Sequence, residues 1–577
     1  MTTRDYIKKR NEGDKNMRKF KFVIVIAAVA LALIYFNHER VNFTYFMANL
    51  LYEEANAGVT GGNIVFSKKS GFYEEEFDLS IWAPSAEIYY TLDGSEPTKE
   101  SYRYEQPIRI FDASQNENTN SMRTDFSAYF LEEDSRYKIP DYLIDKCTVL
   151  KVAYYDDGQR SKTEERTYFV DYGEKSGYND VSIISVTAEP ESLFDPTVGI
   201  YVLGDTFEKY TQRVDYEKEQ EYSWEANYKN SGREWEREAH IEVFNQNKQL
   251  VLSQQVGLRI QGGVSRAYYP KSLNIYARDE YGSNRMKYDF FGTGYYPQRV
   301  TLASGGNDYI GKIRDRIGAE LTSNYNFCTM HYVPYVVFLN GEYWGFYYLT
   351  EKYDEHYIEH YYDIDKDNVI IVKQYELEAG MLEDYALYEE MRSFIEKADM
   401  TIDENYEKAC TMIDMESFID YYAAEIYMGR NGDWPEANYA LWRSRKVSPK
   451  AYEDGKWRWM LFDVNTSALH SDLEEHDTLA YALEECRMFR NLSKNEKFKN
   501  DFANKLREMR DVVFTLEQVE SKLGEYELLM SGPMENHMQR FFGNNNEKFF
   551  IESREVWAFA CLRGEYIEGM LERNGFD

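Results

Sequence analysis

Apolar residues follow three different patterns along this chain of 577 residues. An unbroken apolar run fills residues 22–36. Short runs of β-branched and aromatic residues, separated by turn clusters, fill residues 61–172 and predict strands. From about residue 180 the strands lengthen, and apolar residues at helical spacing appear between them. The pattern predicts an α+β protein in which a small all-β module precedes a larger domain at 180–577.

The apolar run directly follows a strongly basic segment, residues 1–21, and together they predict a membrane anchor at 22–37. A spanning helix usually needs about 17–25 apolar residues, a length reached here if Phe20 is included and Lys21 snorkels. Because basic residues favour the cytoplasmic side, we expect a single-pass protein of the cell membrane with its N-terminus inside and its later domains outside. A cleaved signal peptide is the alternative, although no small-x-small cleavage site follows.

The overall charge argues against one class of partner. The chain has 100 acidic and 67 basic residues, a net charge of −33. Such a surface repels phosphate backbones, so nucleic acid is not expected as a partner, although much of this acidity is simply solvated surface. The five cysteines are scattered without a CxxC pair, and the eight histidines form no HExxH motif, so a zinc site is not indicated.

The all-β module at 61–172 contains a specific stretch, YYTLDGSEPT at 89–98. It joins a strand to a turn at Asp93-Gly94-Ser95, and a second hairpin turn is predicted at Asp157-Gly158. The stretch resembles the small β-sandwich at the C-terminus of chitobiases and β-hexosaminidases. The resemblance implies an accessory or spacer domain, with glycan binding as the alternative.

A strand, a glycine-bearing turn and a second strand are predicted over residues 250–278. Glycines let backbone amides approach an anion closely, and arginines flank this turn. Lys271 begins the second strand, where we expect it to meet nucleotide phosphates as a point charge. An ordinary hairpin is the alternative. The turn supplies these candidate cofactor-binding residues: Arg259, Gly262, Gly263, Ser265 and Arg266.

A helix at 312–326 and a hairpin at 335–350 follow. The helix carries Glu320, the candidate partner of Lys271, whose alternative is a solvent-facing carboxylate. The hairpin turns at Asn340-Gly341, the strongest short hairpin signal, and Glu351 follows it directly. This order of elements is typical of the N-terminal lobe of a protein kinase.

Farther along, a predicted helix at 415–429 leads to Asp433 and Asn438. Their spacing, D-x-x-x-x-N, is that of a kinase catalytic loop, in which the carboxylate orients the acceptor hydroxyl and the amide oxygen helps to hold a cation. Asp463 comes directly after a predicted buried strand, a position suited to holding Mg²⁺ against phosphate oxygens.

Together these pieces resemble the CotH (spore-coat protein H) kinase family over roughly 180–530. The resemblance rests on GLRIQGGVSRAYYPKSLNIYAR, KIRDRIGAEL, VFLNGEYWGFYYLTEKYDE, GDWPEANYALWR and KWRWMLFDVN. It implies an atypical two-lobed protein-kinase-like fold that uses ATP and Mg²⁺ or Mn²⁺ to phosphorylate Ser or Thr of a protein, at the cell surface or spore coat. It further implies roles for Lys271 at phosphate, Glu351 on the nucleotide side, Asp433 in catalysis, and Asn438 and Asp463 at the metal.

The family's metal motif looks like W-D-x-D, whereas this chain has F-D-V-N at 462–465. Asn465 still offers an oxygen but no charge, so a weak or inactive kinase-like adhesion or glycan-binding protein is the alternative function. A glycoside hydrolase is not indicated, because no carboxylate pair falls into a recognisable acid/base arrangement. The kinase hypothesis requires four side chains to converge on one cleft: Lys271, Asp433, Asn438 and Asp463.

Overall fold

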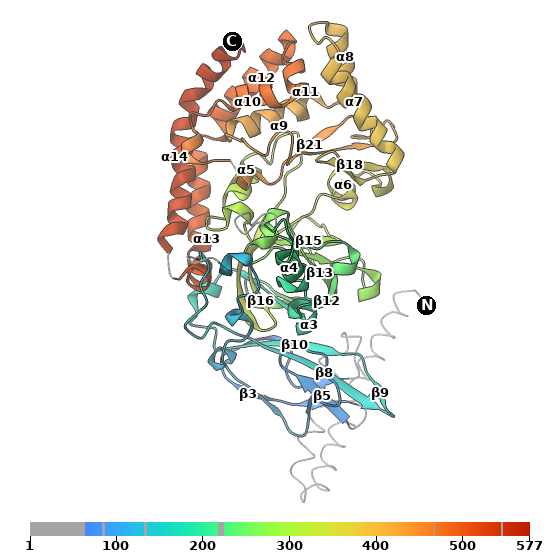
Figure 1. Ribbon diagram of the computed structural model, residues 1–577, viewed down its shortest axis with the longest axis vertical. Helices are drawn as coiled ribbons and strands as arrows, with labels where there is room; N and C mark the ends of the chain where they lie inside the picture. The colour runs from blue at the N-terminus through green and yellow to red at the C-terminus, as the bar shows by residue number, and fades with distance from the viewer. Residues whose placement is uncertain are drawn as a thin grey trace, which may run out of the picture.

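The computed structural model describes residues 64–83, 87–131, 135–216, 224–466, 468–543 and 546–576. Three parts follow one another along the long axis of the molecule: a β-rich region, a β-barrel and a helical unit that holds the C-terminus (Figure 1). The prediction of a mixed α+β chain with β structure first and helices last is confirmed.

The β-rich region is built on one six-stranded sheet and two short strand pairs. Its predicted hairpin at Asp157-Gly158 is present, with positive φ at both residues, as a tight two-residue turn requires. The sheet order is β2 (Gly71–Tyr73), β10 (Glu164–Val170), β8 (Thr148–Asp156), β5 (Glu87–Thr91) and β6 (Tyr102–Arg103), with β9 (Gln159–Arg160) on β8. The pairs are β1 (Val65–Phe66) with β4 (Ile81–Trp82), and β3 (Phe77–Leu79) with β7 (Ile108–Ile110).

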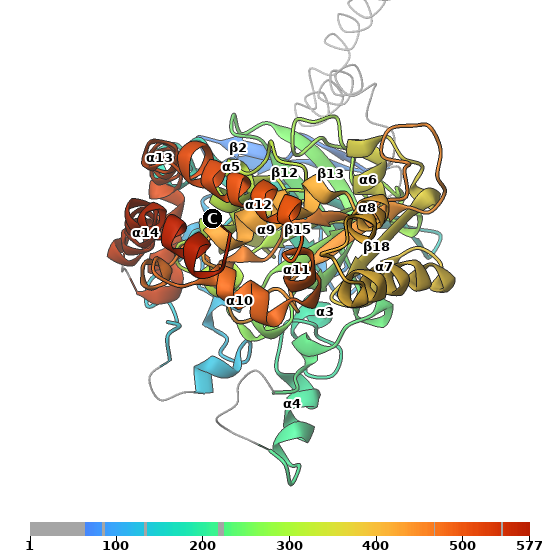
Figure 2. The same ribbon diagram turned by 90° about the horizontal axis from the view of Figure 1, so that it is seen from above.

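The middle of the molecule is a closed barrel, whereas the sequence predicted only its hairpins. The turn at Asn340-Gly341 has positive φ at both residues, which confirms the hairpin expected there. Helix α4 (Gly204–Thr211) projects from the body (Figure 2). The barrel order is β11 (Ser182–Ala188), β12 (Arg237–Phe244), β13 (Leu250–Ile260), β14 (Leu273–Tyr276), β15 (Arg299–Ala303), β17 (Glu342–Thr350) and β16 (Tyr332–Leu339).

The helical unit surrounds a four-stranded sheet of order β19 (Glu376–Ala379), β18 (Val369–Lys373), β20 (Ala440–Ser444) and β21 (Arg458–Met460). Helix α9 is buried along its whole length in the largest hydrophobic core, because its aromatic and aliphatic residues surround the helix axis. The helices are α5 (Arg314–Leu321), α6 (Glu355–Tyr362), α7 (Tyr385–Lys397), α8 (Asp403–Met412), α9 (Met415–Tyr427), α10 (Thr478–Glu485), α11 (Arg487–Leu492), α12 (Glu496–Glu508), α13 (Leu516–Phe542) and α14 (Asn546–Arg573).

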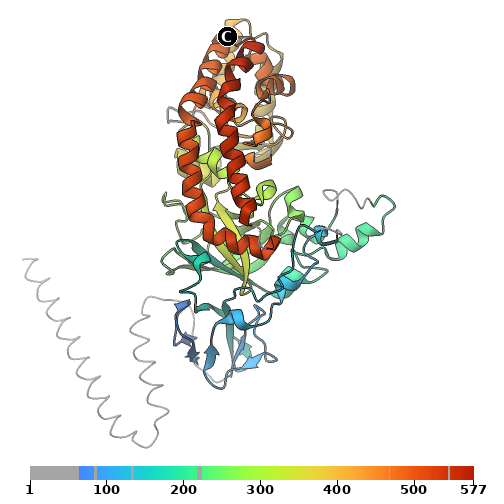
Figure 3. The ribbon, with the colours of Figure 1, turned by 90° about the vertical axis from the view of Figure 1, so that its left-hand side faces the viewer.

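The two longest helices, α13 and α14, run side by side and reach from the helical end down to the barrel (Figure 3). Near the C-terminal end of α13, the Arg540 guanidinium donates a hydrogen bond of 2.7 Å to the hydroxyl of Tyr269. The Nδ1 atom of His537 accepts one of 3.2 Å from the main chain of Phe346 on β17. The helical unit is therefore attached to the barrel by α13 as well as by the segment after β17.

The predicted membrane location requires correction. Among the residues that the structure describes, no helix combines the length and the apolar character needed to cross a bilayer. Helices α13 and α14 are long enough, but both carry charged residues along their length. The span predicted at 22–37 and the basic segment at 1–21 lie outside the described residues. We therefore no longer assign the chain to a membrane.

Candidate active site

The loop that follows α9 brings Asp433 and Asn438 together. The side-chain amide of Asn438 donates a hydrogen bond of 2.7 Å to Oδ2 of Asp433. Its oxygen accepts one of 2.8 Å from Gln374 at the end of β18. Asn438 has a φ of 46°, a left-handed conformation that asparagine tolerates better than most residues. The five-residue spacing seen in the sequence therefore corresponds to a direct contact.

Asp463 comes to the same place from the end of β21. One nitrogen of Arg430 donates a hydrogen bond of 2.5 Å to the main-chain oxygen of Asp463. The same buried guanidinium lies 3.7 Å from Oδ1 of Asp433 and 3.2 Å from the carboxylate of Glu425. Burial is the main cause that raises the pKa of Asp463, and the charge of Asp433 adds to it. Three of the four residues expected to converge therefore do so, around an arginine that the sequence reasoning did not single out.

Helix α5 adds a further carboxylate, Asp315, that was also missed. Its Oδ1 accepts a hydrogen bond of 3.1 Å from the main-chain nitrogen of Asn465, and its Oδ2 accepts one from the Asn465 side chain. That side-chain nitrogen is also 3.4 Å from Oδ1 of Asp463. Burial, followed by the nearby charge of Asp463, raises the pKa of Asp315 to about 7. We call Asp315, Asp433, Asn438, Asp463 and Asn465 the acid cluster.

The oxygens of the acid cluster suit a hard divalent cation. Oδ1 of Asp433 and Oδ1 of Asn465 are buried and accept no hydrogen bond from the described residues. Mg²⁺ prefers such carboxylate and amide oxygens, and a cation would relieve the repulsion between the Asp315 and Asp463 carboxylates. Within the described part of the chain, no three His, Cys, Asp or Glu side chains form a metal-binding group. A cation here would therefore depend on the amide oxygens as well.

Lys271 lies elsewhere. It lies two residues before β14 and is fully buried, with its ammonium 3.6 Å from the ring centre of Tyr228. Its ammonium donates hydrogen bonds to the main-chain oxygens of Arg266 (2.5 Å) and Tyr268 (3.3 Å). Complete burial lowers its pKa far below the usual value. The prediction that Lys271 joins the other three residues in one cleft is therefore wrong.

Glu320 does not pair with Lys271 either. Its carboxylate accepts hydrogen bonds from Arg316 (2.7 Å) and from the hydroxyl of Tyr526 (2.8 Å) on α13, and lies 3.0 Å from the Lys522 ammonium. Glu320 thus joins α5 to α13, while Asp315 on the same helix belongs to the acid cluster. The predicted ion pair of Glu320 with Lys271 is wrong.

Glu351, which follows β17, is buried in a network of its own. It accepts hydrogen bonds from the main chain and the Nδ1 atom of His331, at 2.6 and 2.8 Å, and one of 2.5 Å from the hydroxyl of Tyr361 on α6. These contacts fix the segment that leads from the barrel to the helical unit. His356 and His360 both lie on α6.

The predicted glycine turn is a short 3₁₀ helix, η8 (Val264–Ala267), braced by its own residues. Gly262 has a φ of 116°, and a Cβ there would collide with the hydroxyl of Ser265. Gly263 accepts a hydrogen bond of 3.4 Å from the Lys229 ammonium on its main-chain oxygen. Arg266 donates to the main-chain oxygen of Gly262 at 2.6 Å, so its guanidinium is engaged within the turn.

A second glycine loop lies between this turn and the acid cluster. The hydroxyl of Tyr268 is 3.0 Å from Oδ1 of Asn307. Gly305 and Gly306 have φ values of 108° and 57°, and a Cβ on Gly306 would lie 3.4 Å from Oδ1 of Asn465. The Gly-Gly pair before the helix was the available signal for this loop, and the sequence reasoning passed over it.

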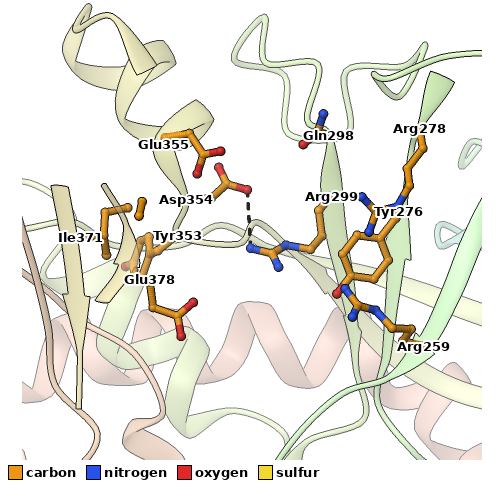
Figure 4. A pocket seen from close by; sticks show the side chains of 11 residues that line it. Arg259, Tyr276, Arg278, Gln298, Arg299, Tyr353, Asp354, Glu355, Ile371 and Glu378 are labelled. Carbon is orange, nitrogen blue, oxygen red and sulfur yellow. Dashed lines mark ion pairs between the residues drawn. The ribbon is translucent and has the colours of Figure 1, made fainter. Parts of the chain in front are cut away.

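A cavity of about 240 Å³ lies between the barrel and the sheet of the helical unit (Figure 4). On β13, β14 and β15 the inward neighbours are core residues, so Arg259, Tyr276 and Arg299 face the cavity. The opposite wall includes Asp354, whose carboxylate is 3.6 Å from the Arg299 guanidinium, and Glu378 from β19. Of the residues predicted to bind a cofactor, Arg259 is the one that lines this cavity.

The comparisons with known proteins place the chain in a family. The model of the family described as CotH kinase protein matches residues 258–567, more than half of the chain. The model described as Fn3 associated matches residues 78–168, and so identifies the β-rich module without confirming its finer resemblance to the chitobiase module. No curated protein matches this chain. On the strength of the first match, which takes in β13 to β15, the acid cluster and both long helices, the chain belongs to the CotH kinase family.

Proposed function

We propose that this chain is a phosphotransferase that moves the γ-phosphoryl group of ATP to a Ser or Thr hydroxyl of a protein. The observation that carries the proposal is the acid cluster. Asp433 and Asn438 come from the loop after α9 and Asp463 from the loop after β21, and Arg430 contacts both loops. Membership of a kinase family gives the reaction class, and the cluster gives the residues.

Asp433 is the residue placed to handle the acceptor hydroxyl. Asn438 occupies its Oδ2, while its Oδ1 is buried, lies 3.7 Å from Arg430 and accepts no hydrogen bond from the described residues. A carboxylate oxygen held in this way can orient a hydroxyl and accept its proton. Arg430 fixes the carboxylate from behind, so its part is to position Asp433.

Asp463, Asn465 and Asp315 are the residues that would hold Mg²⁺ or Mn²⁺ in this proposal. A cation bound there would neutralise charge on the phosphate oxygens and so favour departure of ADP as the leaving group. The chain itself supplies two buried carboxylates with raised pKa values and the unpaired Oδ1 of Asn465. Because Asn465 is neutral, this set attracts a cation less strongly than the aspartate expected at that position.

The test is transfer of labelled phosphate by the full chain, with ATP and Mg²⁺ or Mn²⁺, to a mixture of Ser- and Thr-containing proteins. Asp433→Asn and Asp463→Asn are each expected to lower the rate at least a hundredfold. Asp472→Asn, at an exposed position near the cluster, is the matched control and is expected to keep full activity. Equal rates for Asp433→Asn and the unaltered chain would remove the basis of the proposal.

A second candidate function follows from Asn465. A cluster with a weakened cation site supports a domain that binds nucleotide without transferring phosphate. Tight ATP binding together with a transfer rate no faster than that of Asp433→Asn would favour this binding role over the enzyme.

A further inference from the structure

Three cationic side chains lie around the cavity, on the way to the acid cluster. Arg299 begins β15 and lines the cavity, and the register of β15 with β17, in which Thr301 faces Thr350, brings Lys352 beside it just after β17. Lys373 ends β18 two residues after Ile371, which lines the other wall, and its ammonium lies over the ring of Phe462, the neighbour of Asp463. The charges of Arg299 and Lys373 act on Lys352, in keeping with this placement. We call these three cationic side chains the cation track.

The two lysines of the track have no close acidic partner. Neither forms an ion pair with a carboxylate of the described residues, and the Lys373 ammonium lies 4.2 Å from the ring centre of Phe462. Glu378 and Asp354 attract Lys352 only from a distance. Two half-buried ammonium groups repel each other. An anion bound between them would replace this repulsion with attraction. On a chain of net charge −33, this lack of an acidic partner marks a place suited to a polyanion.

Arg299 retains hydrogen-bonding capacity toward the same space. Its Nε is buried and has no hydrogen-bond partner among the described residues, and its contact with Asp354 is a long 3.6 Å. The Asp354 carboxylate is itself engaged at the start of α6, where it accepts hydrogen bonds from the main-chain nitrogens of His356 and Tyr357. Figure 4 shows the Arg299 guanidinium lying between Asp354 and Tyr276.

We infer that Arg299, Lys352 and Lys373 hold the phosphate tail of a nucleoside triphosphate whose base and sugar lie in the cavity beneath Tyr276. The inference rests on the proposed function and gives these residues the role that the sequence assigned to Lys271. The tail then points from the cavity to Asp463, the direction that phosphoryl transfer requires. An Arg and two Lys supply both the fork-shaped and the point-charge donors that phosphates accept.

The experiment measures ligand binding to the full chain by calorimetry, with Mg-ATP, inorganic tripolyphosphate and adenosine as separate probes. Lys352→Met and Lys373→Met are each expected to weaken Mg-ATP binding at least tenfold and to abolish tripolyphosphate binding, leaving adenosine binding unchanged. Lys446→Met, at an exposed position, is the matched control. If the Lys352→Met/Lys373→Met double variant bound Mg-ATP as tightly as the unaltered chain, this inference would be overturned and the proposed function would stand. If the unaltered chain bound no nucleotide, both this inference and the proposed function would be overturned.

A second measurement needs no variant and covers the case in which a substitution impairs folding. An amine-reactive reagent is applied to the unaltered chain, and the labelling rate of each lysine is read by mass spectrometry. Mg-ATP is expected to protect Lys352 and Lys373 at least fivefold and to leave Lys271 and Lys446 unchanged, whereas adenosine protects neither. Protection of Lys271 without protection of Lys352 or Lys373 would return the phosphate role to the residue first predicted.

Discussion

The guanidinium of Arg430 donates a hydrogen bond of 2.5 Å to the main-chain oxygen of Asp463 and so joins the loop after α9 to the loop after β21. The guanidinium also lies 3.2 Å from Glu425, and both side chains are fully buried. One side chain therefore fixes the positions of two loops that each contribute to the acid cluster.

Replacing this arginine is expected to be costly. Arg430→Met leaves the Glu425 carboxylate buried without its partner, a change that typically costs about 3–5 kcal/mol. We expect the free energy of unfolding, measured by denaturant titration, to fall by about that amount. Arg573→Met removes a largely exposed ion pair with Asp477 and is expected to cost less than about 1 kcal/mol. Equal losses for the two variants would contradict the organising role of Arg430.

Asn465→Asp is expected to strengthen cation binding. A third carboxylate beside Asp315 and Asp463 adds charge where the cation would sit, so Mg²⁺ or Mn²⁺ affinity should rise about tenfold in calorimetry. In the absence of a divalent cation the same variant should melt at a lower temperature, because like charges then lie together. Asn500→Asp, on the exposed side of α12, is the control. An affinity unchanged from that of the parent chain would remove Asn465 from the cation site.

The contact between the β-rich module and the barrel should respond to pH through Glu165. Its carboxylate accepts a hydrogen bond of 2.8 Å from Gln255, and burial raises its pKa to about 7 from 4.5. The folded chain therefore holds a proton that the unfolded chain has released between about pH 4.5 and 7, so this group lowers stability as pH rises through that window. Lys151 and His240 face it, and burial lowers the pKa of His240 to about 4.

Glu165→Gln removes that contribution. The free energy of unfolding of the variant minus that of the parent should rise by up to about 1.4 kcal/mol per pH unit between about pH 4.5 and 7. Because His240 titrates in both proteins, the difference isolates Glu165. Glu164→Gln on the same strand is the matched control. A difference that stays constant across this pH range would show that Glu165 is already ionised in the folded chain.

Nucleotide binding should take up a proton at Lys352. Burial, with repulsion from Lys373 and Arg299, lowers the pKa of Lys352 to about 7, so at pH 8 much of it is neutral in the free protein. Bound phosphates favour the charged ammonium and raise that pKa, so a proton is drawn from the buffer. Calorimetry of Mg-ATP binding at pH 8 in buffers of different ionisation enthalpy should reveal this uptake. Lys352→Met should abolish it; uptake that persists in the variant would point to another group.

Local spacing was enough to predict half of the site. Asp433 and Asn438 are five residues apart in one loop, and Asp463 follows its strand directly, so each position could be recognised without knowing the fold. The same holds for the hairpin at Asn340-Gly341, because its turn chemistry is local. The presence of both strands and helices could likewise be predicted from the spacing of apolar residues along the chain.

The remainder depended on which way side chains face. Lys271 follows a glycine turn but lies two residues before β14, and its ammonium bonds back to the main-chain oxygens of Arg266 and Tyr268, an arrangement that no local spacing shows. The choice between Asp315 and Glu320 could not be made from spacing either: both lie on α5, and only the packing of α13 against that helix decides which one meets Asp463. Strand β15, which Arg299 begins, follows a long irregular segment. The sequence therefore did not show which side chains of this strand face the cavity.

Helix α13 gives the molecule a further bridge between the barrel and the helical unit, besides the chain segments that pass between them around α5 and after β17. Two parts joined at several separated points resist bending, because any rotation that opens one side must stretch or slide the other. Arg540 and His537 fasten the far end of this bridge to the barrel. The cavity between the barrel and the helical unit therefore lies between two parts that are tied together at several places, and we expect the separation of its walls to change little.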